Sequence, residues 1–406
     1  MQYVKHPARS TQHAAPSTEH AAPSTEHPAP ASGLYLHVPF CSAICNYCNF
    51  NRGLFDADVK RKYVDALIQE IRGAHGLRPA KVLADTIYFG GGTPSLLEPE
   101  EVQSVIEACC EAFDVAADRE VTLEANPESV TEERLRGYRA AGVNRLSFGV
   151  QSFRDDELRR LSRLHDAVRA RTAFDEARRA GFENVSLDLM MWLPGQHAGE
   201  WLDSVGAAAA LGPEHLSLYL LEVYPNAPLK DEMARARCSQ APDEDAATMY
   251  LEAMELLDDA GYEQYEISNV ARSGRQSRHN VKYWSDGNWL GFGCGAHSTF
   301  NGVRWKNLSA TQDYIDHVSR GLPAATDTRS LSPAERLGDA LFMGLRLTAG
   351  VSLDVFRVRY GVDVWRRYGD ALAPFIQDGY LQKQGDRLWL TRRGMLLANE
   401  VMAVFV

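Results

Sequence analysis

Residues 35–48 read Tyr-Leu-His-Val-Pro-Phe-Cys-Ser-Ala-Ile-Cys-Asn-Tyr-Cys, an apolar run that ends in three closely spaced cysteines. These are Cys41, Cys45 and Cys48, in the spacing Cys-x3-Cys-x2-Cys. Three thiolates on one tight loop can hold three corners of a [4Fe–4S] cube and leave the fourth iron without a protein ligand. A structural zinc ion usually takes four protein ligands, and the nearest other candidate, His37, lies on the strand side of the loop. The spacing therefore predicts a cluster with one iron open to a small molecule.

The composition of the chain limits the classes of protein to which it can belong. The chain has 406 residues, of which 45% are hydrophobic and 24% are charged, and its formal net charge is −11. This charge argues against broad binding to nucleic acid or to an anionic membrane. No apolar stretch has the length of a membrane span, and the polar N-terminus lacks the apolar core of a secretory signal. With seven cysteines and an oxygen-sensitive cluster, the chain is predicted to be cytoplasmic, without an integral membrane segment.

Residues 1–32 have a composition unlike that of the rest of the chain. They repeat the heptapeptide His-Ala-Ala-Pro-Ser-Thr-Glu at 13–19 and 20–26 and contain almost no large apolar side chains. Such a segment cannot offset the entropy that ordering would cost. We predict a disordered, low-complexity tail.

From residue 33 to about residue 270, short β-rich runs alternate with amphipathic helical segments. The predicted strands are 34–38, 86–89, 121–124, 145–150, 185–191 and 216–223. The predicted helices are 59–74, 100–114, 131–142, 166–181 and 197–211. This alternation predicts an α/β fold with a parallel sheet, an incomplete (β/α)6 barrel. In such folds the functional residues lie at the carboxyl ends of the strands.

Unusual residues stand at or near these strand ends. Glycines 90–92 follow the second strand, Glu124 ends the third, and Gln151 follows the fourth. Asp188 lies inside the fifth run, which should be buried on both faces, and a buried carboxylate needs a partner or a ligand. A structural alternative is that Asp188 pairs with Arg163 or with a helix N-terminus.

The cysteine motif resembles that of the radical S-adenosylmethionine (SAM) enzymes, in which the open iron chelates the amino and carboxylate groups of SAM. Tyr47, directly before the third cysteine, matches the pattern of that family too. The resemblance implies reductive cleavage of SAM to methionine and a 5′-deoxyadenosyl radical. It does not identify the substrate.

From about residue 33 to the C-terminus the chain resembles the oxygen-independent coproporphyrinogen III oxidase family. The resemblance rests on the motifs YLHVPFC, GGGTPS, LEANP, FGVQS, LSRLH and LDLMMWLPG. It implies that SAM is bound by Tyr35, Tyr47, Gly91, Gly92, Thr93, Glu124, Gln151, Arg163 and Asp188. The glycine turn with Thr93 would meet the methionine amino end, and the last four residues would meet the ribose and the carboxylate.

Two branches of this family share the scaffold: the oxidase, which decarboxylates two porphyrinogen propionates, and a branch of haem chaperones. The oxidase has a further cysteine two residues after the third, where this chain has Phe50. Residues 278–284, Arg-His-Asn-Val-Lys-Tyr-Trp, match the His-Asn-x-x-Tyr-Trp signature of the chaperone branch. The resemblance makes His279 a candidate axial haem ligand, and the alternative is a packed, hydrogen-bonded histidine. Nearby, Cys294 and His297 are further candidates for a haem pocket.

The C-terminal part is predicted to form a separate small domain. Residues 271–330 form a connecting region, and 331–406 form a helical, winged-helix-like domain. Its first helix opens with Ser332-Pro333-Ala334-Glu335, a capping box with proline at the first helical position, and a hairpin is predicted at 380–390. Ten Lys and Arg against eight Asp and Glu in 331–406 do not make a phosphate-binding face, so a lid or packing role is preferred to DNA binding.

The resemblance implies a haem chaperone that carries a [4Fe–4S] cluster, SAM and haem. Its partners would be haem-accepting proteins and an electron donor. The first alternative is an enzyme, either the coproporphyrinogen III oxidase or another radical enzyme that acts on a tetrapyrrole. The second is an electron-transfer protein with a vestigial SAM site. No catalytic residue is assigned, and whether the chain is an enzyme stays open.

Overall fold

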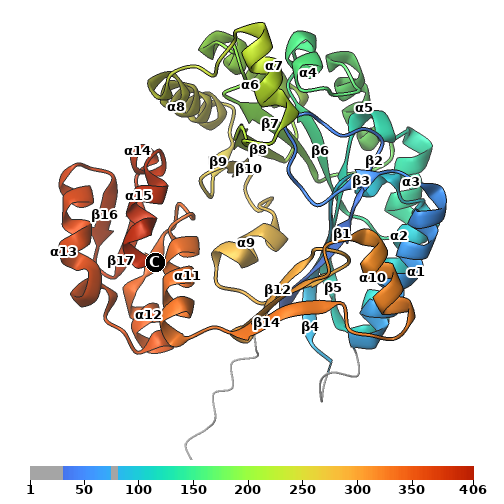
Figure 1. Ribbon diagram of the computed structural model, residues 1–406. Helices are drawn as coiled ribbons and strands as arrows, with labels where there is room; N and C mark the ends of the chain where they lie inside the picture. The colour runs from blue at the N-terminus through green and yellow to red at the C-terminus, as the bar shows by residue number, and fades with distance from the viewer. Residues whose placement is uncertain (1–30, 75–80) are drawn as a thin grey trace, which may run out of the picture. The chain divides into compact units, whose positions relative to one another are not determined.

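Six parallel strands form the predicted incomplete barrel, and their order in the sheet is their order along the chain. The structure, a computed structural model, describes residues 31–74 and 81–406. The strands are β1 (Ser32–Val38), β4 (Leu83–Gly91), β5 (Asp114–Ala125), β6 (Arg145–Gln151), β7 (Val185–Met191) and β8 (His215–Leu220). The helices between them are α1 (Ala57–Gly73), α2 (Pro99–Ala112), α3 (Glu132–Ala140), α4 (Asp155–Arg160), α5 (Ala167–Arg179) and α6 (Ala198–Leu211). Figure 1 shows these helices on the outer side of the curved sheet.

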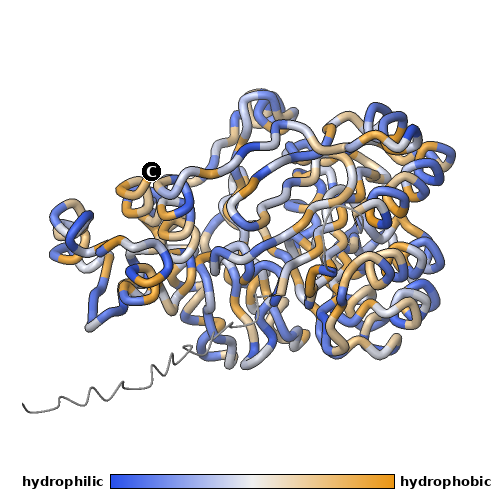
Figure 2. The backbone as a smooth tube through the Cα atoms, turned by 90° about the horizontal axis from the view of Figure 1, so that it is seen from below, coloured by the Kyte–Doolittle hydropathy of each residue, from blue (hydrophilic) through white to orange (hydrophobic). Residues whose placement is uncertain are grey.

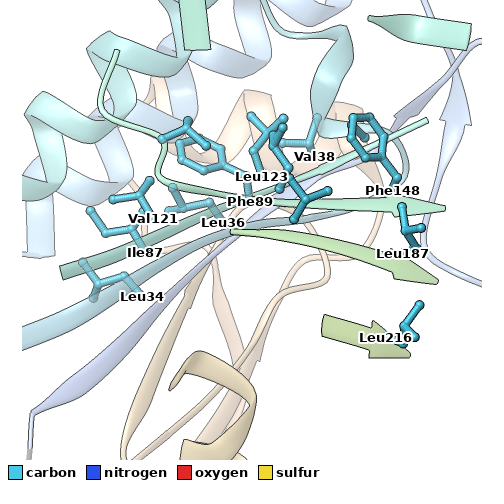
Figure 3. Packing of buried hydrophobic residues seen from close by; sticks show 14 of the residues in the cluster. Leu34, Leu36, Val38, Ile87, Phe89, Val121, Leu123, Phe148, Leu187 and Leu216 are labelled. Atoms are coloured by element: carbon cyan, nitrogen blue, oxygen red, sulfur yellow. The ribbon is translucent and has the colours of Figure 1, made fainter. Parts of the chain in front are cut away.

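Each strand has an apolar outer face and a polar inner face. Leu34, Leu36 and Val38 of β1 are fully buried against the helices, and Figure 3 shows this layer continuing across the neighbouring strands. The alternate positions carry polar and aromatic side chains, with Tyr35 of β1 paired in register with Tyr88 of β4. Because successive side chains of a strand point to opposite faces, the apolar layer holds the helices while the polar positions line the barrel interior.

The predicted boundaries differ from the observed ones by a few residues in most elements. The predicted tail lies outside the described residues over 1–30, and Ser32 already begins β1. β5 begins at Asp114 instead of 121, and β8 ends at Leu220 instead of 223. The six-residue helix α4 was not predicted, because it is too short to show a helical period.

The region 271–330, predicted as a connection, extends the main sheet. Its strands are β11 (Trp289–Phe292), β12 (His297–Phe300), β13 (Val303–Asn307) and β14 (Ala325–Ser330), with α10 (Thr311–Ser319) before the last. β11 pairs in parallel with β1, and the other three follow as antiparallel neighbours. The prediction of a mere connection was wrong, because only the pairing of β11 with the distant β1 makes this region part of the sheet.

The opposite end of the sheet also has short antiparallel strands. After α7 (Pro228–Ala236) and α8 (Asp243–Asp259), the chain forms β9 (Glu263–Gln264) and β10 (Asn269–Ala271), and β10 pairs with β8. The next helix, α9 (Arg278–Trp284), contacts β1 and β4 and lies on the open side of the barrel (Figure 1). Ser277 caps α9, and Glu120 accepts hydrogen bonds from the backbone N–H groups of Arg278 and His279.

The C-terminal domain has the helix and strand order of a winged helix. Its elements are α11 (Pro333–Gly344), β15 (Val351–Ser352), α12 (Leu353–Tyr360), α13 (Val364–Gln377), β16 (Leu381–Gln384), β17 (Arg387–Leu390), α14 (Arg392–Met395) and α15 (Ala398–Met402). The predicted capping box is present: Ser332 accepts from the N–H of Glu335, whose carboxylate accepts from the N–H of Ser332. The hairpin predicted at 380–390 is formed by β16 and β17.

Hydrophobic and hydrophilic residues alternate along most of the helices, as Figure 2 shows. In α1, for example, the buried side chains include Tyr63, Leu67 and Ile71, which recur every four residues on one face. None of the helices in the described residues combines the length and the apolarity needed to cross a bilayer.

One buried ion pair joins the C-terminal domain to the barrel. Arg346 follows α11, and its guanidinium lies 3.1 Å from the carboxylate of Glu266, whose side chain is 0% exposed. The same guanidinium lies over the ring of Trp284, the last residue of α9, at 4.3 Å from the ring centroid. Loss of the Arg346 side chain would remove both contacts. It would also leave the buried Glu266 carboxylate without its cation, which is costly.

We expect Arg346→Ala to lower the free energy of unfolding by about 3 kcal/mol, since it leaves Glu266 buried without a cation. Arg329→Ala is the matched control, because its partner Glu335 and Arg329 itself are about half exposed (45% and 52%), and exposed pairs contribute about 0–1 kcal/mol. Urea unfolding of the two variants measures the difference. Equal losses in both variants would contradict a structural role for the Arg346 pair.

Candidate functional site

A cavity of about 410 Å³ opens at the carboxyl ends of the parallel strands. All the residues predicted to hold the cluster or SAM line it, with the exception of Tyr35. These are Cys41, Cys45, Tyr47, Cys48, Gly91, Gly92, Thr93, Glu124, Gln151, Arg163 and Asp188. The structure therefore brings together residues that are up to 147 positions apart in the sequence, from Cys41 to Asp188.

The cysteine loop is held at both ends. Before it, Cys41 ends strand β2 (Phe40–Cys41), which pairs with β3 (Gly53–Leu54). After it, Asn51 donates to the carbonyls of Cys294 and Ser309, and its own carbonyl lies 2.8 Å from Nε2 of His37. Between these ends, Asn46 donates to the carbonyl of Arg160 at the end of α4.

The three thiols do not form a site for a single metal ion. Within the part of the chain that the structure describes, no group of three His, Cys, Asp or Glu side chains is arranged around a single metal ion. A [4Fe–4S] cube offers a different iron to each thiolate, so it does not require the sulfurs to converge. Burial raises the pKa of the Cys41 and Cys48 thiols, so binding of iron here would release protons.

The glycine turn is shaped by close packing against the cysteine loop. A Cβ atom on Gly92 would lie 2.7 Å from the carbonyl oxygen of Phe40 and 3.0 Å from Sγ of Cys41, and Gly91 has φ of +120°. The Gly91 N–H donates to Glu124, and the Gly92 N–H donates to the carbonyl of Val38. A ligand would meet the turn through atoms other than these two N–H groups.

Three polar atoms of residues that line this cavity are buried without a partner: Nε of Arg52, Oε1 of Gln151 and Nε of Arg163. Gln151 has φ of 69°, a conformation that is strained for a residue with a side chain and that occurs at binding sites. The Arg163 guanidinium is held by Asn126 and by the carbonyl of Gly149, and it lies 3.5 Å from Sγ of Cys45. Unpaired buried polar atoms are costly, so the Gln151 and Arg163 side chains fit a polar ligand that would complete their hydrogen bonds.

Asp188 and Glu124, two of the three acids that line the cavity, are surrounded by different groups. Asp188 accepts from Ser147 at 3.0 Å and from Ser186 at 3.4 Å. The predicted alternative, a pair with Arg163, was wrong because Arg163 binds Asn126 and Gly149 instead. Burial raises the pKa of Asp188 to about 6.

Glu124 links the floor of the cavity to the glycine turn. One carboxylate oxygen accepts from the Tyr88 hydroxyl at 2.7 Å, and the other accepts from the Gly91 N–H at 3.1 Å. Burial raises the pKa of Glu124 to about 7, and Asp188 adds to the rise. Glu124 and Asp188 therefore put two titratable acids into one cavity.

Sequence reasoning missed several lining residues, among them Asn126 and Tyr219. Asn126 donates to Thr93 and accepts from Arg163, so it connects the glycine turn to the guanidinium. Tyr219 is 42% exposed in β8 and lines the cavity. The alternation along β8 could have identified Tyr219, because it stands two positions after Ser217, whose register partner is Asp188.

His279 and Tyr35 lie below the cavity, in the barrel interior. His279 is 1% exposed, with Nδ1 at 2.8 Å from Oγ1 of Thr86 and Nε2 at 2.8 Å from the Tyr283 hydroxyl. Both ring nitrogens therefore have protein partners, and burial lowers the pKa of His279 to about 3. Axial haem ligation by His279 stays a prediction, and in this conformation it would require breaking one of these hydrogen bonds.

The two further haem candidates do not come together with His279. Cys294 is fully buried beneath the cysteine loop, with its sulfur 3.7 Å from Oγ1 of Thr311. His297 lies in β12 and is exposed. Neither lines the cysteine cavity.

Comparison with known proteins identifies the family of this chain. Residues 35–208 match the Radical SAM superfamily, and residues 331–397 match the HemN C-terminal domain. "Heme chaperone HemW" of Bacillus subtilis is 37% identical over 374 residues, which cover 92% of this chain and 98% of that protein. The chain belongs to the HemW family. HemW of Mycobacterium tuberculosis H37Rv is 38% identical, with 91% of this chain and 93% of that protein covered.

This chain is also similar to a protein with another name, and it shares its fold with an enzyme. "Radical S-adenosyl methionine domain-containing protein 1, mitochondrial" of Bos taurus is 37% identical, with 92% of this chain and 85% of that protein covered. The solved structure of coproporphyrinogen III oxidase (HemN) of Escherichia coli matches this chain with a TM-score of 0.82 at 23% identity, covering 94% of this chain and 91% of the other. This likeness confirms the predicted radical SAM fold with its C-terminal domain.

The cofactors of the HemW scaffold are the [4Fe–4S] cluster and SAM, and the residues of the cavity fit both. Cys41, Cys45 and Cys48 would hold the cluster, which supplies the electron for SAM cleavage. The unpaired atoms of Gln151 and Arg163 would complete their hydrogen bonds on SAM. Acidic and basic groups stand on one cavity wall, as a ligand with both ammonium and carboxylate groups requires.

Replacing any one of Cys41, Cys45 and Cys48 by Ser should abolish most of the cluster, since each thiolate holds one corner of the cube. Anaerobic reconstitution followed by iron and sulfide analysis measures the loss, with about four of each expected in the parent protein. Cys294→Ser is the control, because this thiol lies beneath the loop and outside the cavity. A full cluster in Cys41→Ser would exclude this ligand set.

The affinity for SAM should fall as the pH falls from 8 to 5, because the two acids with raised pKa values become neutral and lose their attraction for the cationic ammonium and sulfonium groups. The loss should approach tenfold per pH unit below the pKa of each required carboxylate. Asp188→Asn should weaken SAM binding by roughly 10- to 100-fold and remove the transition near pH 6.

The pH dependence of folding without SAM should have the opposite sign. The carboxyl groups of Glu124 and Asp188 hold their protons more tightly in the folded protein than in the unfolded chain, because folding raises their pKa values. The free energy of unfolding should therefore fall as the pH rises from about 4 to 7. Equilibrium dialysis with cluster-loaded protein measures the affinity, and urea unfolding without SAM measures the stability. A SAM affinity that is flat across pH 5–8 would contradict the role of these acids.

Proposed function

We propose that this chain is a haem chaperone: it binds haem and transfers it to haem-requiring proteins in the reducing cytoplasm, with a [4Fe–4S] cluster and SAM in the strand-end cavity. The observation that carries the proposal is full-length similarity, since the chain covers 98% of the Bacillus subtilis protein named "Heme chaperone HemW". Haem-accepting proteins and an electron donor for the cluster are its expected partners. The electron donor would be a reductant able to reach the cysteine loop.

Phe50 distinguishes the proposal from the oxidase reading. It stands where the oxidase pattern has a further cysteine, and its side chain is 66% exposed at the wall of the cavity. A phenyl ring has neither a thiol nor a titratable proton, so it cannot replace that cysteine in any reaction. The fold shared with HemN does not favour the oxidase, because a likeness at 23% identity shows the fold and not the activity.

The mouth of the cavity offers an apolar surface for a flat, hydrophobic ligand. Ile44 and Phe50 of the cysteine loop are 44% and 66% exposed, and Leu220 and Tyr224 on the other side are 48% and 37% exposed. All but Ile44 line the cavity. Exposed apolar side chains that gather in one place mark binding surfaces, and we place the porphyrin face on this rim rather than on the buried His279.

Haem titration of the reconstituted protein under anaerobic conditions tests the proposal. We expect a saturable Soret band in the parent protein and about 5- to 10-fold weaker binding in Phe50→Asp, because the substitution puts a charge into the apolar rim. Val358→Asp, which changes a side chain that is 88% exposed in α12, is the matched control and should bind haem normally.

A parallel assay decides between chaperone and oxidase. The reconstituted protein with SAM and a strong reductant should not convert coproporphyrinogen III to protoporphyrinogen IX, and that conversion would establish the oxidase instead. Haem-loaded protein mixed with a haem-free acceptor should transfer its haem. Failure to bind haem at all, with cluster and SAM in place, would refute the chaperone function.

A further inference from the structure

Three aromatic rings form one cluster beneath the SAM cavity, in which each ring contacts the other two. The His279 ring is stacked on Tyr88 with 5.0 Å between ring centroids, and Tyr88 is stacked on Tyr35 at 6.2 Å. His279 also lies 6.4 Å from Tyr35. The short helix α9 thus inserts its histidine against the aromatic residues of β1 and β4.

Hydrogen bonds fix the orientation of the His279 ring. Oγ1 of Thr86 is 2.8 Å from Nδ1, and the Tyr283 hydroxyl is 2.8 Å from Nε2. A neutral imidazole has one donor and one acceptor nitrogen, and both are used. The ring cannot turn without losing both bonds in a site that water does not reach.

The ring cluster fits against strands β1 and β4 only because each strand has a glycine beside it. A Cβ atom on Gly33 would lie 2.9 Å from Cε1 of His279, and one on Gly90 of β4 would lie 2.9 Å from the Tyr35 ring. Real Cβ atoms do not approach other atoms so closely. The backbones of both strands therefore lie directly against the rings and limit their movement.

Two chains of hydrogen bonds, here called arms, lead from the ring cluster to the cofactor site. Through the first, Tyr88 donates to Glu124 at 2.7 Å, and Glu124 accepts from the N–H of Gly91 in the glycine turn. Through the second, the Tyr35 hydroxyl lies 3.1 Å from Nδ1 of His37. Nε2 of His37 lies 2.8 Å from the carbonyl oxygen of Asn51, three residues after the last cysteine.

We propose that His279 is a positioning residue for the SAM site, which acts through Tyr88 on Glu124 and through Tyr35 and His37 on the end of the cysteine loop. The residue would set the geometry of the cofactor site without touching haem or SAM. This role is independent of haem binding, so it stands or falls apart from the proposed function.

A double-mutant cycle on the SAM dissociation constant tests this role. We expect His279→Ala and Tyr88→Phe each to weaken SAM binding about 5- to 10-fold in cluster-loaded protein, and the double variant to be little weaker than His279→Ala, because His279→Ala already breaks the arm that runs through Tyr88. The rate at which a chelator removes iron should rise severalfold in His279→Ala, since the loop loses its second arm. Unlike an effect on global stability, the non-additive loss of SAM affinity reports the contact chain itself.

Two further variants keep the result interpretable. Phe174→Ala truncates an equally buried ring, 3% exposed in the helical layer, and should leave SAM binding and iron release unchanged. Thr86→Val keeps the His279 ring and removes only the Nδ1 partner, so it should weaken SAM binding two- to threefold even if His279→Ala does not fold.

Several results would overturn the proposal. SAM affinity within twofold of the parent in cluster-loaded His279→Ala, or in Thr86→Val where the first variant does not fold, would remove His279 from this role. Fully multiplicative losses in the double variant would do the same. A changed Soret band in His279→Ala with unchanged SAM affinity would assign the histidine to haem instead.

Discussion

The structure depends on one constraint: a strand that is apolar on its outer face must satisfy polar groups on its inner face. The helices need the layer that includes Leu36 and Phe89, and the register then turns Tyr35, Tyr88, Glu124 and Asp188 into the barrel. These groups do not face bulk water, so they form hydrogen bonds inside the barrel, as Asp188 does with the serines around it. Gln151 and Arg163, which each keep a buried polar atom without a partner, line the cavity. The binding site thus includes polar groups whose hydrogen bonds the protein itself does not complete.

The sequence predicted those elements whose signals are local. The parallel strands alternate with helical periods, and the capping box at Ser332 marks the start of α11 within one residue. The cysteine spacing is local as well, and the family resemblance placed the SAM residues that the cavity then brought together. The role of region 271–330 could not be predicted in this way, because the pairing of β11 with β1 joins residues more than 250 positions apart and leaves no mark in either segment.

The same distinction explains the errors at the site. Asp188 stands in a buried run, which correctly predicts a polar partner, but the sequence cannot tell Arg163 from the serines of β6 and β7 that the register places beside it. The spacing of His279, Tyr283 and Trp284 shows that they can share a short helix but not which side of the barrel that helix enters. The glycine turn was predicted to meet the methionine amino end of SAM, and the sequence could not show that two of its N–H groups already bind Glu124 and Val38.

The helix α9 has a further consequence, because its two ends belong to different parts of the protein. His279 near its beginning packs on Tyr88 in the barrel, while Trp284 at its end lies under Arg346 of the C-terminal domain. Since the seven-residue helix α9 carries both side chains, a shift of that domain would move the rings below the SAM cavity. Thermodynamic linkage makes such coupling reciprocal. A protein that binds the C-terminal domain in one position only would therefore change the affinity for SAM, and SAM would change the affinity for that protein by the same factor.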